Sequence, residues 1–282
     1  MEAQQGREFA AYAQNLDLFE AQHYSNLSEW ISERGFELKS ESAYLATFSY
    51  IAGGWLIDTP TELVCNRGLS SLSDAVSATN RGNLDGFSTY DTNHSHRRVN
   101  PAHIETTLSS LESLSVAGER VDSFESFFAA LKRHRRDLLT SGYDEIEAAH
   151  QTFETAWNSI QSISYFGPLS AFDWLEVVIF VHGHKEIAPK KSRPGYLNTG
   201  SNPAKGFEAV FGCDINDDEA GEWVGVLEDF ARDVLNKSMP SAIFDMESAL
   251  CVYYKDQDEV EQVVDKSGKI NDDCLPNRIN DC

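Results

Sequence analysis

Apolar side chains recur every three or four residues along most of this chain, and this helical period constrains the fold more than any other feature. It is clear in residues 7–34, where Gly35 follows as a stop signal, and again in residues 41–51, 124–139 and 146–160. Further helices are predicted over 169–181, from Pro203, around 223–234, and from Pro240 to about Tyr254. The alternation that marks a half-buried strand is nearly absent. The sequence therefore predicts an all-α protein.

Residues 53–101 interrupt the helical period. The stretch is rich in Gly, Asn, Thr, Asp and Ser, and it repeats Asn-Arg-Gly at 66–68 and 80–82. So long a segment with little periodicity is either disordered or functional, and its scattered Leu, Val and Phe side chains favour an ordered, irregular loop region. After it, Asp122 followed by Glu125 fits a helix start with a reciprocal cap.

Length and composition bound the number of domains. With 282 residues, of which 41% are hydrophobic, the chain can bury one large core or two modest ones. We predict a single helical domain over residues 1–255. Residues 256–282 form a polar, acidic tail that we expect to be loosely packed and flexible.

The charge of the chain is strongly negative. Asp and Glu number 45 against 23 Lys and Arg, for a formal net charge of −22. Such acidity ordinarily argues against a partner as negative as DNA. It is also typical of proteins adapted to very high salt, where salt screens the repulsion between carboxylates, and we favour this halophilic interpretation over ordinary acidity. Positive charge is clustered in residues 94–98, 132–136 and 185–193; for 132–136 a local basic groove and a solvated helix face are equally open alternatives.

Cysteine and histidine spacing predicts no metal site and no cofactor. Five cysteines, an odd number without a Cys-x-x-Cys pair, indicate neither a zinc site nor a disulfide framework. His182 and His184 suggest metal, but two histidines without clear carboxylate or thiol companions are more often solvent-facing. The chain begins without the features of a signal peptide, and its longest aliphatic and aromatic run is 177–181. We therefore expect no membrane span and a cytoplasmic location.

Two segments carry glycines at expected helix starts. In residues 165–173, Gly167 and Pro168 form a tight turn whose free amides suit a phosphate, although any corner between two helices can be built this way. In residues 198–206, two glycines, hydroxyl groups and Lys205 stand near a helix start, where they could hold an anion. An ordinary capped helix start is the alternative there.

A third segment, residues 244–255, places polar groups on an expected helix. Glu247, Cys251 and Lys255 follow one another at four-residue spacing and so lie along one face. They form either a buried catalytic group or an exposed charge beside a core cysteine, and taken alone the second interpretation is favoured.

Three segments, taken in their order along the chain, resemble a family of DNA-modifying proteins. They are residues 167–172, residues 200–206, and residues 246–251 with Lys255. The family in question is the α-glutamyl/putrescinyl-thymine pyrophosphorylase family, whose phage-associated helical members are related to DNA glycosylases, to the helical domain of 5-hydroxymethyluracil DNA kinases and to amino-acid:DNA transferases. The resemblance covers residues 145–255. It implies a helix-hairpin-helix, DNA-glycosylase-like architecture and, for a viral protein, the host cytoplasm. Asn202-Pro203 and Val252 depart from the family pattern.

The resemblance also implies a reaction and roles for single residues. An amine or amino acid would displace pyrophosphate from an activated 5-hydroxymethyluracil base in DNA. The resemblance implies DNA or phosphate contacts for Gly167, Gly200, Lys205 and Gly206, and roles in the site for Glu247 and Lys255, which we take as catalytic. The residue types add further phosphate or DNA-binding candidates, which are Arg193, Ser201 and, from the first Asn-Arg-Gly repeat, Arg67. Asp173 is a further catalytic candidate, because its carboxylate could take the proton of the incoming ammonium, or it could instead cap its own helix.

Two other functions stay open at this point. A DNA glycosylase-like or non-catalytic DNA-binding helix-hairpin-helix protein is the main alternative, and a non-enzymatic interaction protein is the other. The sequence offers the glycosylase little, because no Asp follows Gly167 at the required spacing and Glu186 is the nearest substitute.

Overall fold

The computed structural model describes residues 9, 10, 12, 13, 20–84, 93–94, 97–98 and 101–255. Most of these residues are helical, which confirms the all-α prediction. The strands among them form two short antiparallel pairs, β1 (Asn93–His94) with β2 (Arg97–Arg98) and β3 (Ser115–Val116) with β4 (Glu119–Arg120). The chain divides into two compact units, residues 22–189 and residues 190–282 together with 1–21. The single domain over 1–255 stays a prediction, and the expected tail lies outside the described residues.

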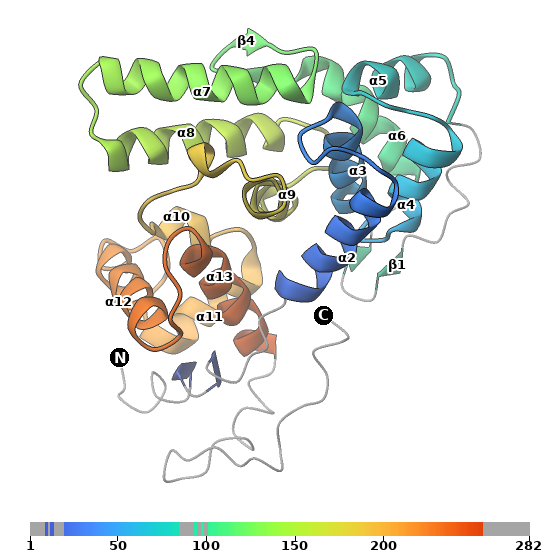
Figure 1. Cartoon of the computed structure of the whole chain (residues 1–282). Helices are drawn as coiled ribbons and strands as arrows, with labels where there is room; N and C mark the ends of the chain where they lie inside the picture. Colours follow the sequence, from blue (N-terminus) through green and yellow to red (C-terminus); the bar gives the residue numbers. More distant parts are fainter. Residues whose placement is uncertain are drawn as a thin grey trace. The chain divides into compact units, whose positions relative to one another are not determined.

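The unit of residues 22–189 contains most of the described helices and helical turns (Figure 1). They are α2 (Glu20–Glu33), which starts at the unit boundary, α3 (Glu41–Ala52), α4 (Asp58–Pro60), the π-helix η1 (Thr61–Asn66), α5 (Leu72–Asn80), α6 (Pro101–Ser110), the 3-10 turn η3 (Leu111–Ser113), α7 (Phe124–Thr140), α8 (Glu145–Gln161), α9 (Pro168–Phe180) and the 3-10 turn η4 (Lys185–Ile187). Helix α2 ends before Gly35, which has a φ of 69° as the predicted stop requires. Helices α7 and α8 pack side by side.

The region expected to be irregular from residue 53 is instead helical over much of residues 58–80. Leu63, Leu72 and Ala75 are buried there, and the Ser71 hydroxyl accepts a hydrogen bond from the amide of Asp74 at 3.1 Å to cap α5. These helices are so short that few turns of apolar repeat stand out among the Gly, Asn and Thr residues. Of the rest of the expected loop region, residues 53–57, 81–84, 93–94, 97–98 and 101 are described, and the others lie outside the described residues.

Helix α7 begins one residue later than the sequence predicted. Ser123 is the N-cap, and its hydroxyl accepts from the Ser126 amide at 3.0 Å. The Ser126 hydroxyl in turn accepts from the Ser123 amide at 3.1 Å. Serine thus completes the reciprocal cap that Asp122 and Glu125 were expected to form.

Helix α9 forms the apolar centre of this unit. Every residue from Ala171 to Ile179 is buried. Trp174 stacks on Phe128 of α7 with ring centres 5.9 Å apart, and Phe48 of α3 stacks on Phe166, just before α9, at 4.7 Å. Aromatic packing from three helices therefore fixes the chain on both sides of the Gly167 turn.

The other unit is built around α13 (Ser241–Lys255). This helix contacts α10 (Pro194–Leu197), α11 (Ser201–Phe211) and α12 (Ala220–Asp233) (Figure 1). From the start of the chain, Phe9 and Tyr12 pack against Tyr253 with ring centres 5.4 and 5.6 Å apart. Helix α13 is therefore covered from several sides, which explains why most of its residues are buried.

Candidate active site

The main chains of α11 and α13 are in direct contact at Gly206. A Cβ atom at this position would lie 2.1 Å from the carbonyl oxygen of Leu250. Only glycine permits so close an approach of two backbones. The second glycine of the predicted phosphate segment thus joins α11 to the helix that carries Glu247.

A buried carboxylate lies at the start of α11. The Thr199 hydroxyl donates a short hydrogen bond to Oε1 of Glu247, and both side chains are only 4% exposed. Gly200 follows as the N-cap of α11 and supplies no side-chain cap. The first amides of α11 are thus left to other acceptors, at the helix end where the macrodipole favours negative charge.

Lys205 and Lys255 bring positive charge to the same pair of helices. The Nζ atom of Lys205 lies 5.1 Å from the ring centre of Tyr254, as a cation–π contact, while the lysine itself is exposed. Lys255, also exposed, is the last residue of α13. Thr199 contacts Glu247, and Lys205, six residues later, contacts Tyr254, which is seven residues after Glu247. The structure therefore brings Glu247 and Lys205 onto one helix pair, with the carboxylate buried and the amine exposed.

A second buried carboxylate on α13 is one that the sequence reasoning missed. Asp245 is 0% exposed, and its Oδ2 lies 3.1 Å from Nζ of Lys237. A charge buried without a partner would cost several kcal/mol, so this ion pair fixes the segment before α13. The available signal was an aspartate between Phe244 and Met246, in an otherwise apolar turn.

Two of the remaining predicted residues, Gly167 and Asp173, belong to the unit of residues 22–189. Gly167 is the exposed N-cap of α9 and has no side-chain cap. Just after it, the Trp157 indole donates to the carbonyl of Pro168 at 2.9 Å. Asp173 is 6% exposed and lies inside α9, so it does not cap that helix.

Arg67 and Arg193 also have defined places. The Arg67 guanidinium pairs with Glu62 at 2.8 Å and donates to the carbonyl of Asn83 at 2.7 Å. It thereby ties η1 to the segment after α5. Arg193 is the half-buried N-cap residue of α10, and Ser201 is exposed in the first turn of α11.

His182 and His184 are buried, at 1% and 3% exposure, so the expectation that they face solvent was wrong. His182 donates from Nδ1 to the carbonyl of Leu38 and accepts at Nε2 from the Thr47 hydroxyl at 2.7 Å. Burial lowers the pKa of His182 to about 4 and keeps it neutral. The residues that contact this ring come from α3 and from the segment before it, far away in the sequence.

His184 belongs to a chain of polar groups. Tyr44 donates to its Nε2 at 2.5 Å, and its Nδ1 lies 3.0 Å from Oε1 of Glu186, which also binds Lys132 at 2.8 Å. Burial lowers the pKa of His184, against the effect of Glu186. For Glu186, burial opposes ionisation, but the bonds from Lys132 and His184 prevail and lower its pKa to about 2.

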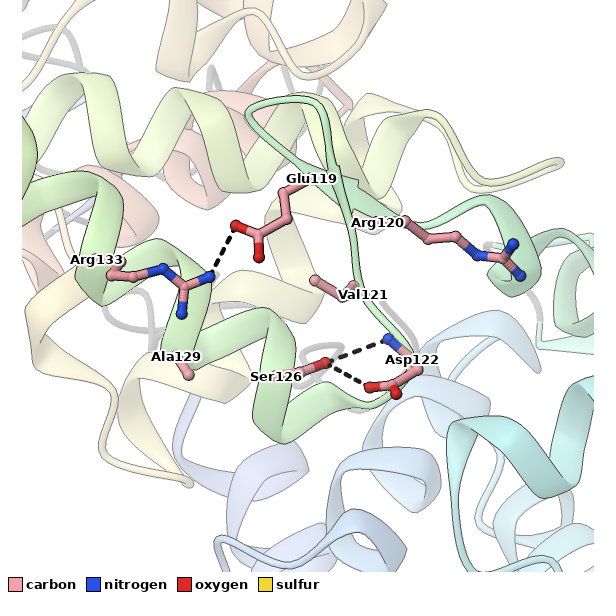
Figure 2. A pocket seen from close by; sticks show the side chains of 7 residues that line it. All are labelled: Glu119, Arg120, Val121, Asp122, Ser126, Ala129 and Arg133. Atoms are coloured by element: carbon pink, nitrogen blue, oxygen red, sulfur yellow. Dashed lines mark hydrogen bonds and ion pairs between the residues drawn. The ribbon is translucent and has the colours of Figure 1, made fainter.

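The positive cluster of residues 132–136 is largely paired with glutamates. Besides Lys132, Arg133 pairs with Glu119 and Arg135 with Glu145, each at 2.8 Å. Figure 2 shows the Arg133–Glu119 pair at the edge of a hollow of about 480 Å³, lined by Glu119, Arg120, Val121, Asp122, Ser126, Ala129 and Arg133. Charges of both signs line it, and it contains no residue of the predicted site. The cluster therefore resembles a paired helix face more than a basic groove.

The described part of the chain offers no sign of a metal site or a disulfide. No group of three or more His, Cys, Asp or Glu side chains in it is placed to hold a metal ion. Cys65, Cys213 and Cys251 take part in no disulfide bond. Within the same residues, no helix has both the length and the apolar character needed to cross a membrane.

The fold and the α11–α13 pair define a helical protein with an uncapped helix start beside a buried carboxylate and an exposed lysine. Comparison with known families gives the class: the family described as amino acid:DNA transferase matches residues 74–260, about two thirds of the 282. The protein belongs to this family, and the predicted relationship to DNA-modifying proteins is confirmed. Neither the curated proteins nor the solved structures contain a match. By its family the protein is a transferase that acts on DNA.

Proposed function

We propose that this protein joins an amino acid, through its amine, to an activated 5-hydroxymethyluracil base in DNA and releases pyrophosphate. Membership of the amino acid:DNA transferase family supports the two substrates. The observation that carries the proposal is the bond between Thr199 and the buried Glu247 at the uncapped start of α11. This bond places Glu247, the proposed proton acceptor, beside the start of α11, the proposed binding site of the diphosphate.

In the proposed step, the amine nitrogen attacks the methylene carbon that carries the diphosphate. The C–N bond forms as the C–O bond breaks, pyrophosphate leaves with the electron pair, and the ammonium proton passes to Glu247. Asp173, the other acceptor that the sequence suggested, belongs to the unit of residues 22–189 and is given no part in this step. The diphosphate gains negative charge as it leaves, which Lys205, Arg193 and the first amides of α11 would stabilise, with Ser201 as a hydroxyl donor.

Further residues are proposed to hold DNA and charge. Gly206 keeps the α11 backbone on α13 and so sets the distance between the anion site and Glu247. Lys255, the last residue of α13, would add positive charge to the same pair of helices as Lys205. Gly167 would present main-chain amides to the DNA backbone. Arg67 would contact a DNA phosphate only by giving up its bonds to Glu62 and to the carbonyl of Asn83. A base in duplex DNA must leave the stack to react, at a cost of a few kcal/mol.

The test supplies each substrate separately. Purified protein is mixed with a duplex oligonucleotide that contains a pyrophosphorylated 5-hydroxymethyluracil and with the standard amino acids, singly and pooled. We expect pyrophosphate release together with a nucleoside whose mass is increased by the amino acid residue, measured by mass spectrometry of the digested DNA. Release of a free base would indicate a glycosylase, and no pyrophosphate with any amine would refute the proposal.

Variants test the assigned roles. Glu247→Gln should lower the rate about 100-fold or more, because a general base contributes about 10²–10⁴-fold. Lys205→Ala should lower it about 100-fold, as loss of a charge-stabilising donor does, and Lys205→Arg should retain much of the rate. Lys191→Ala is the matched control, since Lys191 is also exposed and precedes α10. An unchanged rate in Lys205→Ala would remove this residue from the site.

A further inference from the structure

Tyr165 is presented to solvent at the tip of the α8–α9 connection. It is 64% exposed, and its backbone has a φ of 60°, a left-handed conformation that is unfavourable for a residue with a side chain. Both neighbours are fixed, because the Phe166 ring is buried, the Ser164 amide donates a hydrogen bond to α6 and the Ser164 carbonyl accepts one from the same helix. The fold therefore holds this tyrosine outward at an energetic cost.

The tip is anchored to α6 on both sides of Ser164. Thr107 donates to the Ser164 carbonyl at 2.9 Å, and the Ser164 amide donates to the Ser110 hydroxyl at 3.0 Å. From the same helix, the His103 ring stacks on Tyr165 with centres 3.8 Å apart and planes 3° from parallel. One face of the tyrosine is thus occupied by His103 and its orientation is set before any partner binds.

The connection is also free of charge in a very acidic chain. Residues 155–172 contain no Asp, Glu, Lys or Arg, although the chain has 45 carboxylates. A polyanion such as DNA can approach this tip without meeting carboxylates of the connection itself. A surface that binds an acidic or basic protein partner would instead be expected to carry charge here.

We infer that the Tyr165–His103 stack is a platform for an unpaired nucleobase of the DNA substrate, with the base lying on the free face of Tyr165. The inference rests on the proposed function for its partner. Aromatic side chains bind bases by stacking whatever the sequence, since every base has a π-face. A preoriented ring loses little freedom when the base binds, so each contact contributes more to affinity. Tyr165 would therefore position the DNA strand and take no part in the transfer itself.

The test measures binding of a short fluorescein-labelled thymine oligodeoxynucleotide by anisotropy, and of the same oligomer with abasic sites in place of its central bases. Tyr165→Ala should weaken binding to the intact oligomer about 5- to 150-fold, the range for loss of one stacked base. Tyr165→Phe should bind like the wild type. Tyr143→Ala is the control, because Tyr143 is another exposed tyrosine of the same unit.

The abasic oligomer separates stacking from a structural effect. The wild type should prefer the intact oligomer to the abasic one, and Tyr165→Ala should lose most of that preference while unfolding at the same temperature as the wild type. If Tyr165→Ala binds both oligomers as the wild type does, the inference is overturned and the proposed transfer is untouched. If the wild type binds neither oligomer, the platform is refuted, whereas the proposed transfer is still decided by pyrophosphate release from the modified duplex.

Discussion

Replacing Gly206 with alanine should separate the two helices that carry the candidate site. The added Cβ would have to move from 2.1 Å to at least 3.4 Å from the Leu250 carbonyl oxygen, a shift of about 1.3 Å between two main chains. Overpacking of this kind costs about 1–3 kcal/mol, and the change from glycine to alanine within a helix returns about 0.5–1 kcal/mol of it. We therefore expect a net loss of about 1 kcal/mol, and at most about 2.5 kcal/mol, in the free energy of unfolding.

Urea denaturation followed by circular dichroism measures this loss. The matched control is Gly225→Ala in α12, where a Cβ meets nothing within 4 Å and the variant should be about 0.5–1 kcal/mol more stable than the wild type. Activity adds a second readout, because a shift of α11 should also lengthen the bond between Thr199 and Glu247. If Gly206→Ala is as stable as Gly225→Ala, the close contact at Leu250 is not a constraint and the reasoning fails.

Two further predictions concern buried polar groups. Thr199→Val should destabilise the protein by about 1–3 kcal/mol, the cost of removing a partner from a buried acceptor, as measured in urea, whereas Thr199→Ser should restore the bond to Glu247. The pKa of His182 is about 4 in the folded protein, below the ordinary value of 6.5, so the unfolded chain binds the additional proton and stability should fall as the pH drops from about 6.5 to about 4, by up to about 3 kcal/mol. His182→Gln should flatten that slope in urea titrations at several pH values; an unchanged slope would assign the pH dependence to other groups.

Long helices were the part of the fold that the sequence could predict. In α7 and α8 the apolar residues repeat over enough turns to show the period, and Gly35 marked the end of α2 correctly. Helices α4, η1 and α5 were missed because each has too few turns and because polar residues outnumber apolar ones there. The order of the three short segments, residues 167–172, 200–206 and 246–251 with Lys255, also predicted the family, because order and spacing can be read from a single sequence.

Contacts between distant segments could not be predicted in the same way. The closeness of Gly206 to Leu250 and of Thr199 to Glu247 depends on how two helices cross, which no local pattern encodes. The same holds for His184, whose partner Tyr44 is distant along the chain. The sequence therefore predicted a solvent-facing histidine where the structure has a buried, hydrogen-bonded one. A histidine's surroundings decide its burial, and here they come mostly from other helices.

The distribution of charge bears on both the candidate site and the Tyr165 platform. Lys132, Arg133 and Arg135 pair with glutamates, so the densest positive cluster of α7 has little charge left for DNA. Under the two proposals, this acidic protein would hold DNA through the α8–α9 connection, which has no charged residue of its own, and through single cations such as Lys205. The halophilic interpretation, which stays a prediction, sharpens this point. At about 1 M salt the screening length falls to about 3 Å, which weakens phosphate contacts, whereas stacking on an aromatic ring carries no such penalty. Under those conditions an oriented tyrosine would hold DNA better than a basic groove.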